Sequence, residues 1–318
     1  MKSFHEAEFY QLDEDRLALR LPAMRETIHL LPRKTAEQIF SATIPPAEDP
    51  YWEKRYAQKG RMIPSEEYSK WKKEIITVLS NPLIAAEIKL KLDIPEAMIK
   101  LLLNRMAFEG IVLRIGARSL RSNTISYVAT KSWIEKAIVH RGQDKALVWL
   151  AGEYLHAFGP ARIKDFQWWT GITSGKAKTA MAELDTIPVG NELLLLKKDL
   201  PGFETFTLSG RDSLNLLPQW DPYSMGYAPD GRERLVDPAM QQYIYGSIGA
   251  TSGNALGAVL INGLAHGSWD FRFSGEKMMV KLKMFEKPTQ KVLADIEKQI
   301  GDVALFMKAK TTSIDKIL

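Results

Sequence analysis

The stretch that most constrains the fold covers residues 144–198, where an apolar pattern of helical period gives way to tight turns and a short hairpin. Its first segment carries an apolar stripe wide enough to face a core. Gly159 and Pro160 follow the stripe, and they predict the end of a helix because proline cannot continue one. The stripe consists of Leu147, Leu150, Ala151, Tyr154 and Phe158.

Two more helices and a hairpin are predicted in the rest of this stretch. Residues 163–169 form a short helix that ends at Gly171. Thr173 or Ser174 then caps a third helix, which runs to about Leu184, by accepting an orphan backbone N–H group. Two short strands complete the stretch. Three helices followed by a hairpin is the order of a winged helix-turn-helix.

The third helix would be the one that reads nucleic acid. Its first turns carry Lys176 and Lys178 between glycine and alanine residues, which let a helix sit deep in a groove while the lysines reach phosphate oxygens. The alternative is that the two lysines are ordinary solvated charge. For Trp168 and Trp169, packing in the core is favoured over a base-stacking platform.

Residues 64–130 repeat the same plan. Helices are predicted over residues 65–79, 82–92 and 95–110, and residues 111–115 and 124–129 alternate like the arms of a hairpin. This is again the order of a winged helix. Arg114, Arg118 and Arg121 lie on or beside the wing, where guanidinium groups suit phosphate or minor-groove contact. A solubilising loop is the alternative to a nucleic-acid contact here.

The two ends of the chain have a different character. Residues 1–60 are irregular, with a strand at 27–31, a helix at 35–43 capped by Thr35, and a proline-rich linker. From Pro201 onward the pattern is β-like, beginning with alternation over residues 203–208. Strands at 255–262, 268–273 and 278–285, separated by glycine turns, predict a small curved sheet or barrel, and a helix follows over residues 289–301.

Composition excludes several classes of site. The 318 residues are 45% hydrophobic and 25% charged and include no cysteine, so there is no thiolate nucleophile, thiolate metal site or disulfide. The five histidines have no metal-ligand spacing, and we expect no metal or cofactor. No apolar run is long enough to span a membrane, and the N-terminus lacks the apolar core of a signal peptide, so we expect a cytoplasmic protein. The net charge of +5 suits a polyanionic partner but is too small to argue for one by itself.

Four segments together resemble the winged-helix family of AlkZ-type DNA glycosylases. They are RETIHLLP (25–32), YLHAFGPARIKDFQWWTGI (154–172), LLPQWDPYSMGY (216–227) and GAVLINGLAHGSWDF (257–271), and they occur in the family's order. The family removes bulky alkylated purines and unhooks interstrand crosslinks. The resemblance implies tandem winged helices around double-stranded DNA, followed by a barrel-like part.

The predicted fold class is therefore α+β, with tandem winged-helix (helix-turn-helix) domains and a β-rich barrel-like C-terminal domain. In the resembling family, residues 1–62 correspond to the remnant of a first winged helix plus a linker. Residues 63–140 and 141–200 are predicted winged helices, and residues 201–318 form the β-rich domain with its terminal helix.

Active members of the family carry a Gln–apolar–Gln or Gln–apolar–Asp pair in their first winged helix, ahead of the segment that matches RETIHLLP. We expect this chain to begin after that pair, inside the first winged helix. Gln11-Leu12-Asp13 fits the pattern but lies only fourteen residues before Arg25, so we interpret it as a surface triplet. Asp221, followed by Pro222, is the remaining candidate for catalysis, and a turn that its side chain stabilises is the favoured alternative.

Three hypotheses follow. The first is a DNA-binding protein of the glycosylase family, acting on alkylated or crosslinked DNA without the catalytic pair. The second is an active alkylpurine DNA glycosylase, and the third is a winged-helix transcription regulator. The first predicts a monomer that binds double-stranded DNA, is nucleoid-associated when bound, and contacts it through Lys176, Lys178, Thr173, Arg114, Arg118 and Arg121.

Overall fold

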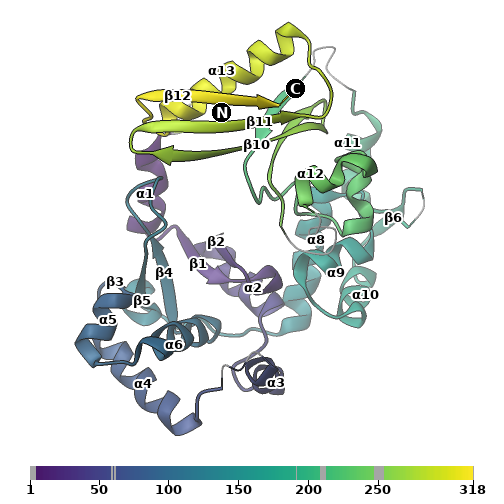
Figure 1. Cartoon of the computed structure of the whole chain (residues 1–318). Helices are drawn as coiled ribbons and strands as arrows, with labels where there is room; N and C mark the ends of the chain where they lie inside the picture. Colours follow the sequence, from purple (N-terminus) through teal and green to yellow (C-terminus); the bar gives the residue numbers. More distant parts are fainter. Residues whose placement is uncertain are drawn as a thin grey trace. The chain divides into compact units, whose positions relative to one another are not determined.

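The computed structural model describes residues 5–58, 60, 62–190, 192–207, 213–246 and 254–317. The chain divides into two compact units (Figure 1). The first unit contains residues 1–152 and 170–183, and the second contains residues 153–169 and 184–318. Each unit is described by itself. Among the described residues, no helix combines the length and the apolar character that crossing a bilayer requires.

An antiparallel sheet is the framework of the first unit. Its strand order is β2-β1-β4-β5-β3, and β1 pairs antiparallel with β4 through Arg20 and Arg114. The sheet therefore joins strands on both sides of the domain boundary predicted near residue 62. The strands are β1 (Ala18–Pro22), β2 (Ile28–Pro32), β3 (Leu83–Ile84), β4 (Val112–Gly116) and β5 (Ile125–Ala129).

Three helices share a core with the β4–β5 hairpin. They are α4 (Ser65–Val78), α5 (Ala85–Leu92) and α6 (Glu96–Phe108), and their buried residues include Ile75 and Leu102. The predicted helices and hairpin of residues 64–130 are thus present, while their identification as a winged helix stays a prediction. The expected start of α5 at Pro82 is wrong, because β3 first pairs with β5.

The first unit contains further helices, and three of them, α1, α2 and α7, contact its sheet. Thr35 does not cap α2, which begins directly after Pro32; the Thr35 hydroxyl instead donates to the Pro32 carbonyl oxygen at 3.4 Å. The boundary between the two units falls within helix α8, after Gly152. The helices are α1 (Glu6–Glu14), α2 (Arg33–Thr43), α3 (Pro50–Gln58), α7 (Thr130–Ile134), α8 (Gln143–Phe158) and α10 (Ser174–Ala182).

An open sheet, with strand order β12-β11-β10-β9-β8, dominates the second unit. The predicted barrel-like domain is wrong for the described residues, since β12 and β8 are edges that do not pair with each other. Strand β12, which we did not predict, pairs parallel with β11 after the intervening helix α13 (Gln290–Phe306), so it extends the sheet instead of closing it. The strands are β8 (Leu214–Leu217), β9 (Gly257–Ile261), β10 (Leu264–Ser274), β11 (Lys277–Met284) and β12 (Thr311–Ile317).

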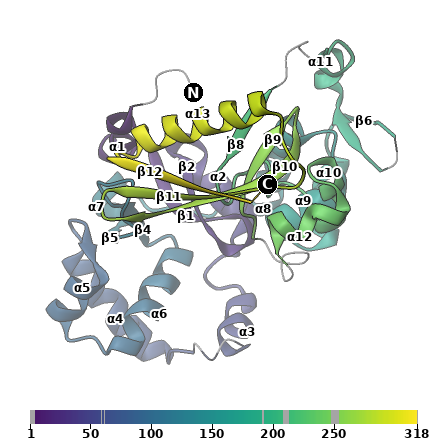
Figure 2. The ribbon, with the colours of Figure 1, turned by 45° about the horizontal axis from the view of Figure 1, so that its top comes forward.

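Helix α13 explains why the sheet stays open. It lies along one face of the sheet (Figure 2). Its Ile296 and Ile300 belong to the same buried cluster as Val280 and Leu282 of the sheet. The apolar stripe of the helix and the apolar face of the sheet bury each other, so the sheet need not close into a barrel to cover that face. The predicted helix was too short, since α13 continues through Gly301 to Phe306.

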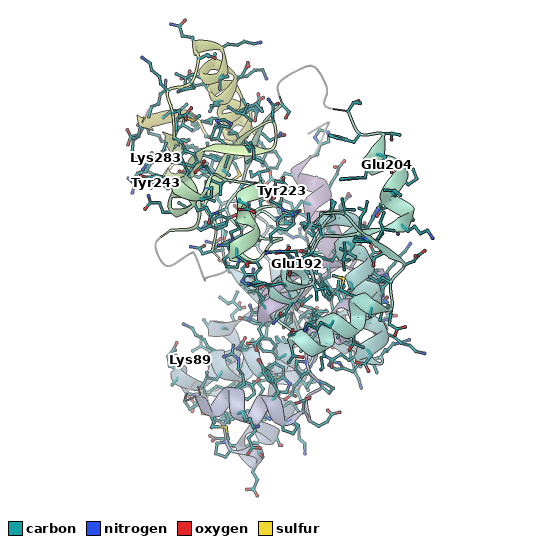
Figure 3. The ribbon with its side chains drawn as sticks, turned by 90° about the vertical axis from the view of Figure 1, so that its right-hand side faces the viewer. Lys89, Glu192, Glu204, Tyr223, Tyr243 and Lys283 are labelled. Atoms are coloured by element: carbon teal, nitrogen blue, oxygen red, sulfur yellow. The ribbon has the colours of Figure 1, made fainter. Side chains whose placement is uncertain are left out.

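The segment before β8 is helical where β structure was expected. Helix α11 (Leu200–Glu204) occupies the start of the alternating residues 203–208, the last of which lies outside the described residues. Pro201 is in the first turn of α11, where its fixed φ favours a helix. The hairpin of β6 (Thr186–Pro188) and β7 (Leu194–Leu196) is present as predicted, and α12 (Gln241–Tyr245) is an additional helix. Lys283 lies 3.6 Å from the ring centre of Tyr243 on α12 (Figure 3).

A buried carboxylate organises the remainder of the second unit. Asp165 of α9 (Ile163–Thr170) is fully buried and accepts from the Arg162 side chain at 2.8 and 3.0 Å. It also accepts from the backbone N–H groups of Arg162 and Ala228, both at 3.0 Å. Arg162 reaches the exposed Asp230 as well, at 3.0 Å. This network fastens the start of α9 to the chain segment around Ala228.

Aromatic side chains fill the core beside that network. Trp169 packs on Tyr154 and Phe166, with ring centres 5.1 and 6.4 Å apart, and Trp168 packs on the apolar cluster around Ile244. Both tryptophans are half-buried and pack against apolar or aromatic neighbours, in agreement with the expectation of packing. The Tyr154 hydroxyl donates to the Gly226 carbonyl oxygen at 2.8 Å.

Candidate nucleic-acid interface

Helix α10 begins as the sequence predicts. Thr173 is its cap residue, and the Thr173 hydroxyl oxygen accepts from the backbone N–H of Lys176 at 3.4 Å. Ala177 and Ala180 are buried on the inner face, while Lys176 and Lys178 are exposed. The helix therefore turns small residues inward and cations outward.

The two lysines are not equivalent. The Lys176 ammonium donates to the Gln143 side-chain oxygen at 2.5 Å. Lys178 lies two positions further along the helix, and residues with that spacing point in different directions. A single phosphate group would therefore not contact both ammonium groups. Together they present two separate points of positive charge on one exposed helix.

The wing arginines occupy different environments. Arg114 is half-buried in β4, donates to the Asn104 side chain at 3.4 Å, and lies over the ring of Tyr127. Arg118 has 79% of its side chain exposed and pairs with Glu14 at 2.7 Å. Arg121 is exposed, and its backbone N–H donates to the Ser119 hydroxyl. Arg118 and Arg121 are on the outer part of the hairpin connection, whereas Arg114 faces α6, so the three do not form one cluster.

Asp221 is engaged in the turn that was the favoured alternative to a catalytic role. Its carboxylate accepts from the backbone N–H of Tyr223 at 2.9 Å, and its carbonyl oxygen accepts from the Ser224 hydroxyl and the Met225 N–H group. These bonds are those of an Asx turn. The Asp221 side chain is half-buried, and the bonds named above join it only to residues of its own turn, not to a second carboxylate.

Gln11 and Asp13 lie on helix α1 with divergent environments. Gln11 is exposed, and both Asp13 oxygens accept from the guanidinium group of Arg20 in β1. Residues two apart on a helix do not face one another. The Gln11 amide is therefore in contact with solvent, whereas the charge of the Asp13 carboxylate is balanced by Arg20.

The histidines are isolated from each other. His29 bonds the Thr27 hydroxyl at 2.8 Å, and burial lowers the pKa of its imidazole. His156 lies 3.0 Å from the Asp199 carboxylate. Within the described parts of the chain, no group of three or more His, Asp or Glu side chains is arranged to hold a metal ion.

The structure also shows a feature that we did not predict, at Arg25 and Glu26. Both residues have left-handed backbone conformations, with φ of 52° and 59°, although neither is glycine. Glu26 accepts from the Arg55 side chain of α3 and from the Tyr51 hydroxyl. No sequence signal marks this turn, since the usual indicator, a glycine or asparagine, is missing.

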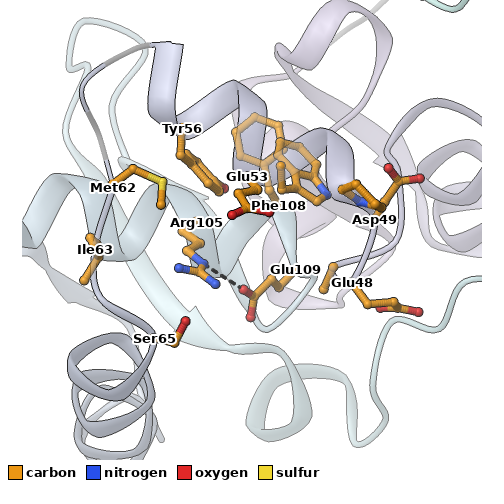
Figure 4. A pocket seen from close by; sticks show the side chains of 13 residues that line it. Glu48, Asp49, Glu53, Tyr56, Met62, Ile63, Ser65, Arg105, Phe108 and Glu109 are labelled. Carbon is orange, nitrogen blue, oxygen red and sulfur yellow. Dashed lines mark hydrogen bonds and ion pairs between the residues drawn. The ribbon is translucent and has the colours of Figure 1, made fainter.

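One pocket adjoins this turn, and it shares three aromatic side chains with a second pocket, those of Trp52, Tyr56 and Phe108. The smaller pocket, of about 280 Å³, is also lined by Arg25, Glu26, Arg55 and Asn104. The larger, of about 380 Å³, contains Arg105 and Glu109, which bond each other at 3.1 Å (Figure 4).

Comparison with known proteins identifies the fold and the family. The model of the family described as "DNA glycosylase AlkZ-like" matches residues 1–306. The chain belongs to this family of DNA glycosylases. A search of the curated proteins gives no match.

Among solved structures, the chain is similar to the Streptomyces sahachiroi DNA glycosylase AlkZ, with a TM-score of 0.69 and 18% sequence identity. The likeness covers 96% of this chain and 84% of that one. At this identity it shows a shared mixed α+β fold. Membership of the family, in turn, implies DNA as the substrate and DNA repair as the process.

Proposed function

We propose that this protein binds double-stranded DNA as a monomer and acts in the repair of alkylated or crosslinked bases. The family match over residues 1–306 carries this proposal, because it covers nearly all of the chain. The exposed lysines of α10 support it, since a capped helix with cations on its outer face suits a phosphate backbone. We expect the protein to be cytoplasmic and nucleoid-associated when bound.

The proposed contacts are made by two sets of residues. Lys176 and Lys178 contact phosphates, and Thr173 holds the start of their helix. Arg118 and Arg121 extend from the hairpin connection toward the backbone, with Arg114 at the base of the same hairpin. Contacts of this kind position a protein on DNA without reading its sequence, so we expect similar affinity for unrelated duplexes.

We further propose that Gln11 and Asp13 do not catalyse base release. The exposure of Gln11 and the pairing of Asp13 with Arg20 support this, because a catalytic carboxylate must be able to interact with water or the sugar. A second candidate function is active excision of alkylated purines. The family match favours that candidate, since the family is named for this activity class.

Base release decides between the two functions. A duplex treated with a methylating agent is incubated with the chain, and free methylated purine is measured by chromatography. No release together with duplex binding supports a binding role. Release that persists in Gln11→Ala and Asp13→Asn establishes an active glycosylase that uses other residues, whereas release abolished by either substitution would overturn our reading of this pair.

Duplex binding is tested with the Lys176→Glu, Lys178→Glu double variant. The affinity of the wild-type protein should fall linearly with the logarithm of the salt concentration, and the slope should be shallower in the double variant because phosphate contacts are lost. Lys298→Glu, Lys308→Glu on and after α13 is a control with the same change in charge. Equal binding by the wild-type protein and the α10 variant would contradict the assignment.

A further inference from the structure

We propose that Arg25 and Arg55, together with Asn104, form a binding site for a phosphodiester group of the DNA backbone next to the start of α10. The inference rests on the proposed function, since it names a contact that duplex binding would use. The site is the pocket of about 280 Å³ in the first unit. Arg25 begins the segment RETIHLLP, which carries part of the family resemblance, but no role was predicted from the sequence for Arg25, Arg55 or Asn104.

The charge of the pocket selects an anion. Among the described residues that line it, Glu26 is the only carboxylate, whereas Arg25 and Arg55 are both always protonated. Glu26 accepts from the Arg55 Nε atom at 2.9 and 3.0 Å, so it neutralises one of the two cations and fixes its orientation. The described lining residues, with two guanidinium groups and one carboxylate, carry one net positive charge. A guanidinium group and an amide that line the same pocket match the several acceptor oxygens of a phosphate.

The Glu26 carboxylate is itself held in place. Burial raises the pKa of Tyr51 to about 12, and the bond to Glu26 adds to this rise. The Tyr51 hydroxyl therefore stays protonated and donates to Glu26. The Glu26 side chain is only 19% exposed and that of Arg55 is 25% exposed. Groups positioned in advance lose little conformational entropy when a ligand binds.

The backbone of this turn is strained. Two consecutive residues other than glycine have left-handed conformations, which cost free energy and persist where the surroundings impose them. The backbone N–H of Glu26 donates to the Ala23 carbonyl oxygen at 3.0 Å, and that of Thr27 donates to the Met24 carbonyl oxygen at 3.2 Å. The turn therefore interrupts the path from β1 to β2 and places Arg25 on the pocket wall instead of in a strand.

The turn before α10 packs directly against Arg25. Gly171 has φ of +80°, and a Cβ atom at this position would lie 3.2 Å from the Cα and Cγ atoms of Arg25. Thr173, the cap of α10, follows two residues later. The pocket and the exposed lysines of α10 are thus neighbours within one unit, so that one DNA strand could contact both.

Asn104 links the pocket to the hairpin. Its side-chain oxygen accepts from Arg114 at 3.4 Å. A side-chain amide also has two N–H donors, which suit a phosphate oxygen. Arg114, which is half-buried and bonds Asn104, would then also act as a positioning residue for the Asn104 side chain.

The test compares the salt dependence of duplex binding in single-charge variants. A short fluorescein-labelled duplex is titrated with the wild-type protein, Arg25→Gln, Arg25→Lys and, as a control outside the pocket, Lys298→Gln. Arg25→Gln should bind more weakly, with a slope of log affinity against log salt that is shallower by about 0.9 for the lost phosphate contact. Arg25→Lys should keep the slope of the wild-type protein, because the charge is retained, and so should Lys298→Gln.

The outcomes separate this inference from the proposed function. If the wild-type protein binds with the expected salt dependence and Arg25→Gln has the same slope, the pocket assignment is overturned and the proposed function stands. If the wild-type protein does not bind duplex DNA at any salt concentration, both fail. Circular dichroism verifies the fold of each variant.

A measurement on the wild-type protein makes the result independent of the folding of Arg25→Gln. The side-chain Nε–H resonances of Arg25 and Arg55 are assigned with Arg25→Lys and Arg55→Lys and followed by NMR while the unlabelled duplex is added. Both resonances should shift as the DNA binds. Resonances that stay in place at saturating duplex would refute a phosphate contact in this pocket.

Discussion

Arg162 contacts two carboxylates whose burial differs, and this allows a sharp prediction about stability. Asp165 is 1% exposed at its side chain, whereas Asp230 is 49% exposed. We predict that Asp165→Ala lowers the free energy of unfolding by about 3–5 kcal/mol, because it leaves a largely buried guanidinium group without its closest carboxylate. Asp230→Ala should cost no more than about 1 kcal/mol, as for other exposed ion pairs.

The hydrogen bonds of the two carboxylates explain why Asp165→Ala should lower the unfolding free energy more than Asp230→Ala. Asp165 accepts four hydrogen bonds, two from the Arg162 side chain and two from the backbone N–H groups of Arg162 and Ala228. Ala228 is buried, so its N–H group would find no water to replace the lost acceptor. Asp230 is in contact with solvent, and water can take over its bonds to Arg162 and Lys164.

Urea unfolding followed by tryptophan fluorescence measures both variants, since Trp168 and Trp169 lie on the same helix as Asp165. The chain has two compact units, so hydrogen exchange of residues 160–170 and 226–232 should be followed as well, to assign the loss to this region. Exchange should accelerate there in Asp165→Ala alone. Equal effects of the two substitutions would show that burial does not determine the contribution of this network.

Three further predictions concern the first unit. Burial holds the pKa of His29 below the ordinary value of 6.5, so the neutral imidazole is favoured in the folded state. The contribution of His29 to stability should therefore be constant above pH 6.5 and fall at lower pH, where the unfolded chain takes up the proton. His29→Gln should reduce this fall, as measured by urea midpoints across the pH range. Gly171→Ala should lower the unfolding free energy by about 1–2 kcal/mol, since φ is +80° there, and a thermal midpoint equal to that of the wild-type protein would exclude this strain. Thr173→Ala should cost about 1 kcal/mol through loss of the α10 cap, while Thr173→Ser keeps the hydroxyl and should restore the midpoint.

Short-range features of this protein follow from the order of its residues. Thr173 precedes a helix and caps it, and Asp221 precedes a proline and closes an Asx turn. The helices and hairpin of residues 64–130 were likewise predictable, because each depends on residues close together in the chain. The error at Thr35 is also local, because the neighbouring Pro32 precedes the helix start. The error at Pro82 is not local, because β3 pairs with the distant strand β5.

Long-range features were not predictable in the same way. The edge strand β12 has little apolar alternation and becomes a strand because it pairs with β11, which is why an open sheet replaced the expected barrel. The pairing of β1 with β4 joins residues nearly a hundred positions apart.

The pocket lined by Arg25, Arg55 and Asn104 was likewise not predictable from local sequence. Its side chains come from residues 25, 55 and 104, and its shape depends on a left-handed turn without glycine. Residue order alone determined the local helices, caps and turns and the resemblance to a glycosylase family. Tertiary structure decided which charged groups face each other, because the free energy of burial and pairing depends on contacts between distant segments that no local pattern encodes.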